Sequence, residues 1–489
     1  MIRRIKSLLL ENKSSSQTIM KNAFWLTLSQ VGGRIIRAAA IIYVARLLGT
    51  SEYGVFSYAL GLAGFFTLFA DVGINSVLTR NAAQKPSDAR AYFATAFWMK
   101  VLLLTLTALA VIFIAPHFSH IKEATAIMPL VALIVVFDNL RDFWNAYFRS
   151  QEKMEREAFI TLLTNISIAV FCIGILFYSK TAYAITYAYV GSVLVGSLAG
   201  FMLLREEFVK IIANFKMEYA KEILNAAWAT AIIGLLGSFM LSLDVVMLGW
   251  LTNATAIGLY SAAQRIIQVL YMIPTVIASS IFTALSRSVA LQDEATQKNL
   301  MEKSMAILFS VAIPLTVGGI VLGEGIMRLV FGAAYLPATL TFQIFMATIL
   351  FVFPGTLIGN FILAHHKQRD VALYVGTAAL MNVVLDYALI IPFGIAGCAA
   401  ATLIVAIMFN SVMNRFAQRI LPFRLFYHVK TPLIASTVMG LISYGLLALH
   451  VHILSIILVS MLTYGAMLVI LKDPIIQDAK SLLKKARTA

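Results

Sequence analysis

The stretch from Leu454 to Leu471 reads LSIILVSMLTYGAMLVIL and contains no charged side chain. The hydrocarbon core of a bilayer is about 30 Å thick, so a helix needs about 20 apolar residues to cross it. Similar runs occur at Val101–Ala115, Ile160–Tyr178 and Met305–Leu322, and about fourteen can be counted along the chain. A soluble domain that is 60% hydrophobic and 12% charged could not bury so much apolar surface. The sequence therefore predicts an all-α polytopic membrane protein.

The predicted spans are separated by short charged segments, and no outer loop is long enough to fold by itself. The fourteen spans cover residues 22–46, 54–79, 91–115, 125–148, 157–178, 181–204, 222–251, 256–286, 304–322, 341–364, 370–391, 394–414, 431–450 and 452–471. They predict a cytoplasmic N-terminal segment (1–21), an N-lobe (22–204), a cytoplasmic linker (205–221), a C-lobe (222–415), a cytoplasmic loop (416–430), a terminal helix pair (431–471) and a cytoplasmic tail (472–489).

The net charge of +15 would suit a nucleic-acid partner, but the placement of the charges argues against one. When the N-terminus is placed in the cytoplasm, most of the 38 lysines and arginines fall in inner segments. The outer loops then carry only Arg46, Lys122, Lys180 and Arg328. This bias follows the positive-inside rule and predicts both termini in the cytoplasm, with an even number of crossings. The basic residues thus orient the chain in a membrane and do not indicate nucleic acid.

The chain contains an internal repeat. Asn22-Ala23-Phe24-Trp25 reappears as Asn225-Ala226-Ala227-Trp228, and Gly54-Val55-Phe56-Ser57-Tyr58-Ala59 reappears as Gly258-Leu259-Tyr260-Ser261-Ala262-Ala263. Both copies start on the same side, so the two halves are related by an axis along the membrane normal. Two pseudo-symmetric six-helix lobes meeting at a central cavity are typical of transporters. The terminal helix pair lies outside the repeat.

Arg34 and Arg37 are the most informative charges inside the predicted spans, because ionisable groups in a bilayer are costly and mark function by default. They lie about 18–22 Å up a helix that starts at Asn22, and their spacing of three puts them on one face. Guanidinium groups stay charged and bind oxygen pairs, which suits an anionic group with several oxygens. We predict that Arg34, Arg37 and Arg265 line a cavity for an anionic cargo. The alternative is that the arginines pair with acids such as Asp71 for structural reasons.

Other charged residues within spans carry weaker expectations. Asp71 is the first candidate for ion coupling, within reach of Arg34 or Arg37, and Asp244 is expected to be a gate or a solvated residue near the outer end of its span. Lys100 is expected to extend to the inner interface. Asp138, Arg141 and Asp142 stand at i, i+3 and i+4, which favours an intrahelical salt bridge. The sequence shows no metal-ligand cluster, no nucleophile–base pair and no nucleotide-binding loop, so no cofactor is expected.

Local motifs resemble those of a known family. Arg46-Leu47-Leu48-Gly49-Thr50-Ser51-Glu52-Tyr53-Gly54-Val55-Phe56 resembles the R-x-L-G-x-x-x-Y-G-x-F motif of the polysaccharide transporter branch of the multidrug/oligosaccharidyl-lipid/polysaccharide exporter superfamily. Asp71-Val72-Gly73 is similar to the D-x-G that ends the second helix there. Further similarities occur at Asp244 with Met247-Leu248-Gly249, at Leu329-Val330-Phe331-Gly332 with Tyr335 and Ala338, and at Asn382 with Ile391-Pro392, Gly394 and Gly397-Cys398-Ala399-Ala400.

The resemblance covers the whole chain and implies an inner-membrane flippase for undecaprenyl-diphosphate-linked oligosaccharide, such as an O-antigen repeat unit, that works by alternating access. It also implies exchange against H⁺ or Na⁺, a tail groove at residues 431–471, and a polysaccharide polymerase and chain-length machinery as partners. A lipid II flippase and a cation-coupled multidrug antiporter are alternatives from the same superfamily, although a cationic cavity suits cationic drugs poorly. A polymerase or ligase is disfavoured, because it would need acidic catalytic residues in a large outer loop.

Overall fold

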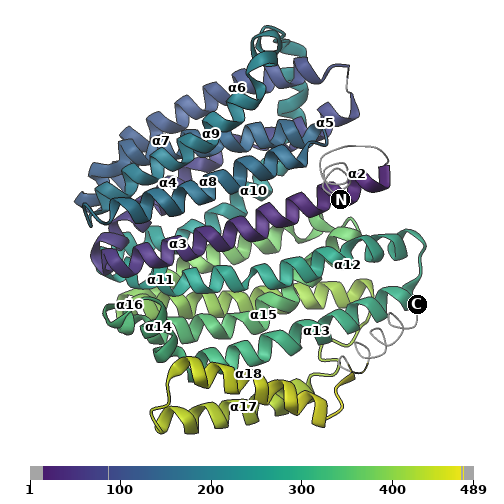
Figure 1. Ribbon diagram of the computed structural model, residues 1–489. Coiled ribbons are helices and arrows are strands. Elements are labelled where there is room, and N and C mark those ends of the chain that lie inside the picture. Colours follow the sequence, from purple (N-terminus) through teal and green to yellow (C-terminus); the bar gives the residue numbers. More distant parts are fainter. Residues whose placement is uncertain (1–14, 86, 475–476, 478–489) are drawn as a thin grey trace, which may run out of the picture. The chain divides into compact units, whose positions relative to one another are not determined.

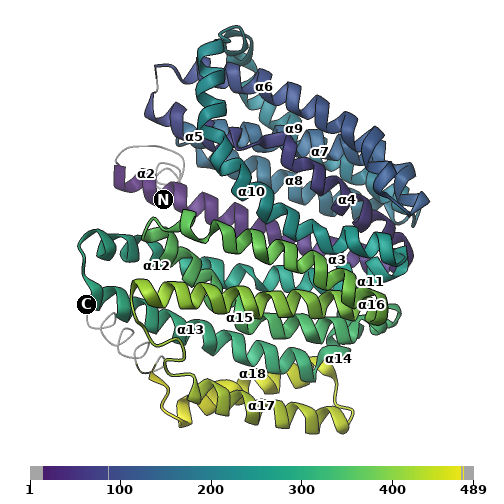
Figure 2. The ribbon, with the colours of Figure 1, turned by 180° about the vertical axis from the view of Figure 1, so that it is seen from behind.

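The computed structural model describes residues 15–85, 87–474 and 477, and among these residues all regular structure is helical (Figures 1 and 2). The expected N-terminal segment 1–21 and the tail 472–489 therefore lie mostly outside the described residues. The chain forms two compact units, Met1–Ser261 and Ala262–Ala489. The boundary between these units falls beyond the linker 205–221 that the repeat suggests, and the lobe boundaries stay a prediction.

The first unit holds the helices that correspond to the first seven predicted spans and the start of the eighth. They are α2 (Ser15–Thr27), the π-helix η1 (Leu28–Gly32), α3 (Gly33–Leu48), α4 (Thr50–Asp71), α5 (Ile74–Gln84), α6 (Ala89–Leu109), the π-helix η2 (Ala110–Ile114), the 3₁₀ helix η3 (Ala115–Phe118), α7 (Lys122–Ser150), α8 (Met154–Ile175), α9 (Ala182–Ile212), α10 (Met217–Leu251) and the first turns of α11 (Ala254–Leu270).

The second predicted span is broken rather than continuous. Helix α4 ends at Asp71, and the next two residues, Val72 and Gly73, both adopt the left-handed conformation with φ of 44° and 79°. Glycine reaches this region freely, whereas a β-branched valine is strained there. Helix α5 starts at Ile74, and the segments Thr50–Thr67 and Phe69–Gln84 are bent by 44° relative to each other. Transporters use such discontinuous helices to place helix ends next to their substrates.

The second unit consists of the rest of α11 and the helices that follow it. They are α12 (Met272–Ala290), α13 (Glu294–Val321), α14 (Gly323–Val330), the 3₁₀ helix η4 (Ala333–Ala338), α15 (Thr339–Ala364), α16 (Gln368–Ile420), α17 (Lys430–Ala448) and α18 (Ile453–Ile470). Helix α16 covers two predicted spans, and Gly394, with φ of 57° and ψ of −135°, separates them.

The terminal pair α17 and α18 forms a hairpin beside α13 (Figure 1). The Ser443 hydroxyl of α17 and the Ser460 hydroxyl of α18 are buried and lie 2.6 Å apart in a hydrogen bond. The Tyr464 hydroxyl donates to the backbone carbonyl of Ser310 in α13 at 2.6 Å. The hairpin thus pairs Ser443 with Ser460 internally and makes a polar contact with the rest of its unit.

Each of the fourteen predicted spans coincides with helix, and the prediction of an all-α membrane protein is confirmed. By length and composition, ten helices of the described residues qualify as membrane spans, and eleven qualify if the bent pair Thr50–Thr67 and Phe69–Gln84 counts as one span. The difference from fourteen arises partly because α16 counts once although Gly394 divides it. The exact number of crossings stays a prediction.

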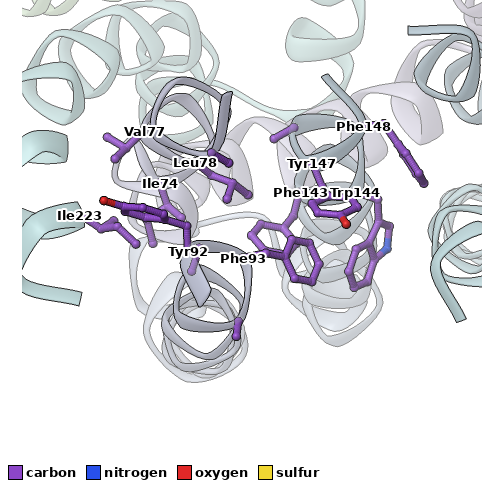
Figure 3. Packing of buried hydrophobic residues seen from close by; sticks show 14 of the residues in the cluster. Ile74, Val77, Leu78, Tyr92, Phe93, Phe143, Trp144, Tyr147, Phe148 and Ile223 are labelled. Atoms are coloured by element: carbon purple, nitrogen blue, oxygen red, sulfur yellow. The ribbon is translucent and has the colours of Figure 1, made fainter. Parts of the chain in front are cut away.

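Aromatic side chains of α6 and α7 pack with apolar residues of α5 and α10 in one core of the first unit (Figure 3). The Phe93 ring of α6 lies 4.4 Å from the ring of Tyr147 and 5.0 Å from that of Phe143, centre to centre. Trp144 also joins this core and packs on Gly200 of α9, where an added Cβ would lie 2.5 Å from the indole. Helix α7 therefore turns Phe143, Trp144 and Tyr147 into the core and leaves its other face for polar residues.

Candidate functional site

The first unit contains a polar cavity of about 390 Å³. Three helices contribute its principal polar side chains, and α5 adds one more. The lining residues are Ser29, Gln30, Arg34, Arg37, Asn75, Arg141, Asp142, Asn145, Ala146, Arg149, Glu157, Thr161 and Asn165.

Helical spacing explains why these residues meet. Arg141, Asn145 and Arg149 recur every fourth residue on α7, on the side away from the aromatic core, and Glu157, Thr161 and Asn165 recur likewise on α8. Residues four apart lie above one another on a helix, so each set forms a polar stripe.

Arg34 and Arg37 come from the first turns of α3, directly after the π-helix η1. Gly33 allows α3 to approach α8, because a Cβ at this position would lie 2.7 Å from Nδ2 of Asn165. Single π-turns widen a helix locally and occur often at functional sites. Both arginines line this cavity of the first unit, and their place in a cavity for the cargo stays a prediction.

The arginines of α7 are neutralised by neighbouring acids. Arg141 lies 2.7 Å from a carboxylate oxygen of Asp138 and 2.7 Å from one of Asp142, which confirms the expected salt bridges within the helix. The Arg149 guanidinium pairs with Glu157, whose side chain is buried. These two arginines shape the wall but carry little unbalanced charge.

The arginines of α3 are more loosely held. Arg34 is exposed to the cavity and makes no ion pair or hydrogen bond among the described residues. Arg37 lies 3.9 Å from Asp138 and 5.4 Å from the ring centre of Tyr189. Four arginines and two acids line the cavity, so the lining is cationic, and Arg34 is the group most available to a ligand.

Asp71 lies where α4 ends and has a different partner from the one expected. Lys100 Nζ is 2.6 Å from Asp71 Oδ1 and 3.3 Å from the side-chain oxygen of Asn139. The prediction that Asp71 pairs with Arg34 or Arg37 is therefore wrong. The prediction that Lys100 extends to the interface is also wrong, since its side chain is fully buried. The lysine was misplaced because sequence alone does not show which faces of α4 and α6 meet.

The two remaining candidates lie away from this cavity. Asp244 is buried, with 4% of its surface exposed, and accepts a hydrogen bond from the Tyr260 hydroxyl at 2.5 Å, so it is not solvated. Its role as a gate stays a prediction. Arg265 belongs to the second unit, where it donates to Gln268 at 3.3 Å. Neither residue lines the polar cavity of the first unit.

A second, apolar cavity of about 640 Å³ lies in the second unit between α13, α15, α16 and α17. Phe309, Phe351 and Phe426 form part of its wall, and Arg415 lies among the lining residues. Leu433 of α17 is the contribution from residues 431–471. The tail groove implied by the family resemblance stays a prediction.

The sequence did not single out Asn75, Asn145, Thr161, Asn165, Arg149 or Glu157 for the cavity. The signal was present as two stripes of polar residues with a spacing of four within apolar helices. In a membrane span, such a stripe faces other protein or a water-filled cavity.

The fold and the cavity together define a multi-pass helical membrane protein of the transporter class. A family model described as "Polysaccharide biosynthesis protein" matches residues 19–289, more than half of the chain, and the chain belongs to this family.

Curated relatives of the chain include two transport proteins. A "probable low-salt glycan biosynthesis flippase", Agl15 of Haloferax volcanii, is 20% identical over 78% of this chain and 80% of its own length. A "putative O-antigen transporter" of Shigella flexneri is 22% identical over 65% of this chain and 78% of its own length.

Solved structures support the fold. The lipid II flippase MurJ in an inward closed conformation is similar with a TM-score of 0.73 and 17% identity, covering 92% of this chain and 99% of that one. An inward-facing multidrug resistance transporter of the MATE family is similar with a TM-score of 0.64 and 15% identity. The match covers 79% of this chain and 97% of the transporter. At these identities the likeness shows a shared fold and does not distinguish their cargoes.

Proposed function

We propose that this protein is a flippase that moves polyprenyl-diphosphate-linked oligosaccharide across the inner membrane by alternating access. The observation that carries the proposal is the cationic cavity in which Arg34 has no acidic partner among the described residues. A transporter of this kind is not an enzyme, because the cargo crosses without a change in its covalent structure.

The chemistry of the cavity fits this cargo. A diphosphate presents several charged oxygens, and guanidinium groups bind such oxygens in pairs. Arg34 and Arg37 would hold the diphosphate, while the polyprenyl tail stays in lipid. Arg265 of the second unit is the proposed third contact, made as the cavity changes its access from one side to the other.

Membrane placement follows from the charges. Both termini would be cytoplasmic, and the cargo would be an undecaprenyl-diphosphate-linked repeat unit of O-antigen or another exopolysaccharide. A polysaccharide polymerase and its chain-length machinery would take the product on the outer side. The names of the curated relatives, which include an O-antigen transporter, support this setting.

A lipid II flippase is a related alternative because it moves the same kind of lipid diphosphate. A multidrug antiporter is a weaker alternative, since a surplus of arginines repels the cationic compounds that such a carrier would bind. A polymerase or ligase has the least support, because these two curated relatives of the present chain are named as a flippase and a transporter.

Ion coupling to H⁺ or Na⁺ remains part of the proposal, with Asp71 as the candidate carrier. The ion pair with Lys100 changes the expected consequence of protonation: a neutral Asp71 would leave the buried lysine unpaired and would not release an arginine. Such a step is energetically costly, and it would occur only together with a rearrangement at the break between α4 and α5.

The proposal is tested by reconstituting the protein in vesicles with a labelled polyprenyl-diphosphate oligosaccharide. The labelled head group should become accessible in the opposite leaflet at a rate that depends on the wild-type protein. The Arg34→Ala variant should abolish this activity. Equal rates in protein-free and wild-type vesicles would contradict the proposed function.

A further inference from the structure

Two carbonyl oxygens of side chains that line the polar cavity have no hydrogen-bond donor among the described residues. They are Oδ1 of Asn75 on α5 and Oδ1 of Asn145 on α7. Asn145 is the more informative of the two, because only 6% of its surface is exposed. Buried polar groups are almost always paired, so an unpaired oxygen at a cavity marks a position where a donor from solvent or from a bound ligand fits.

The nitrogen of the Asn145 amide has one of its two hydrogens engaged. Its Nδ2 donates to the Thr161 hydroxyl at 3.4 Å, across the gap between α7 and α8. Nδ2 of the neighbouring Asn165 donates to the Thr161 backbone carbonyl at 2.8 Å. The bond from Asn145 to Thr161 orients the amide, and its buried Oδ1 is left as a hydrogen-bond acceptor at the cavity.

A diphosphate cannot supply what this acceptor needs. In its ionised form a diphosphate offers oxygen acceptors and no donor, so it would leave Oδ1 of Asn145 unsatisfied. A sugar hydroxyl or an acetamido N–H is a donor of the right kind. A metal cation could also bind carbonyl oxygens, but the arginines that line the same cavity oppose a cation electrostatically.

We propose that Asn145, together with Asn75, forms a subsite for the sugar attached directly to the diphosphate. The inference rests on the proposed function and adds a specificity-determining contact to it. The volume of about 390 Å³ lies at the low end of the ~300–1,000 Å³ that small-molecule sites occupy. Such a cavity holds a diphosphate and the adjacent sugar, and the remaining sugars of a repeat unit would extend beyond it.

The test compares two lipids on the purified full-length protein. One is polyprenyl diphosphate without sugar, and the other carries one hexose or one N-acetylhexosamine on the diphosphate. The wild-type protein should bind the sugar-bearing lipid more tightly. Asn145→Leu should weaken binding of that lipid by about tenfold, the effect of one lost hydrogen bond, and leave binding of the bare lipid unchanged.

Two further variants separate this role from general damage. Thr164 lies three residues beyond Thr161, is fully buried and bonds to the carbonyl of Ile160 outside the cavity, so Thr164→Val is the control for a lost hydroxyl in α8. Thr161→Val removes the group that orients Asn145 and should reduce binding of the sugar-bearing lipid alone. Thermal melting in detergent shows whether each variant is folded.

The outcomes distinguish the two proposals. If Asn145→Leu weakened binding of both lipids equally, or if the wild-type protein bound both with the same affinity, the sugar subsite would be overturned. The proposed diphosphate site would be unaffected by either result. A wild-type protein that binds neither lipid would overturn the proposed function itself. Arg34→Ala should weaken binding of both lipids, whereas Asn145→Leu should weaken binding of the sugar-bearing lipid alone.

Discussion

Gly54 of α4 and Gly258 of α11 lie against each other where the two helices cross. A Cβ on Gly54 would lie 1.7 Å from the carbonyl oxygen of Ala254, and a Cβ on Gly258 would lie 1.9 Å from that of Thr50. The two glycines begin the two copies of the repeated motif, so the repeat makes contact with itself at equivalent positions. Close backbone approach at small residues is the usual basis of helix association in membranes.

Gly54→Ala and Gly258→Ala should each destabilise the protein, because the added methyl group meets backbone atoms that cannot move aside. Overpacking of this kind costs about 1–3 kcal/mol. Thermal melting in detergent, followed by size-exclusion chromatography, measures the effect. Gly359→Ala in α15 is the matched control, since a Cβ there meets no atom within 4 Å. A melting temperature for Gly54→Ala equal to that of the control would contradict the contact.

Arg34→Ala should abolish export of polysaccharide while the protein accumulates normally, because no acid depends on Arg34 for its charge balance. Arg37→Ala should have the same effect on export, with a modest loss of stability from its contacts with Asp138 and Tyr189. Arginine-to-lysine variants should keep part of the activity, since the charge survives without the paired donors.

Immunoblots of membranes and surface staining of the polysaccharide measure accumulation and export. Arg328→Ala, which removes an exposed arginine paired with Glu324, is the control. Normal export by both Arg34→Ala and Arg37→Ala would rule out the cationic cavity as the cargo site.

Lys100→Met should reduce accumulation of the protein, because Asp71 would lose the partner that is 2.6 Å away. Removing one partner of a fully buried ion pair costs about 3–5 kcal/mol, and the cost here should be lower because the Asp71 side chain is 32% exposed. The double variant Asp71→Asn with Lys100→Met should restore accumulation, since neither charge is then left alone. Flipping rates of the double variant under imposed pH and sodium gradients then report on coupling. A double variant that responds to a gradient as the wild type does would remove Asp71 as the ion carrier.

Cysteines placed at Lys122, Lys180 and Arg328 should react with an impermeant thiol reagent in intact cells. Cysteines at Lys153, Lys216 and Arg369 should react only after the membrane is opened. Labelling of the protein without an introduced cysteine should be low, because the native Cys172 and Cys398 are buried. Labelling at Lys216 from outside would refute the predicted orientation of the two lobes.

Hydropathy predicted the helices well because the bilayer imposes a length on each apolar run and requires each helix to satisfy its own backbone. Arg34 and Arg37 could be placed on one face for the same reason, as positions within one helix follow from its geometry. Partners on different helices were harder to predict. Asp71 pairs with Lys100 because α4 and α6 pack with those faces together, and no local pattern encodes that choice.

The break after Asp71 was only partly predictable. The D-x-G motif indicated the end of a helix, yet the predicted span ran on to residue 79. Residues past the break are apolar enough to extend the span, and only the positive φ of Val72 and Gly73 shows where the axis turns. The amides that line the cavity were missed for another reason: a neutral asparagine attracts less attention than a charge, although an unpaired amide in a membrane is also costly.

The hydrogen bond between Ser443 and Ser460 has a consequence for biosynthesis. Helices α17 and α18 follow α13 in the sequence, so they leave the ribosome after the helix on which they pack. Because these two hydroxyls bond to each other inside the hairpin, neither needs a polar partner on another helix when the pair enters lipid. Packing of the hairpin on α13 then becomes a late step of assembly, and the hydrogen bond from Tyr464 to the backbone of Ser310 forms in that step.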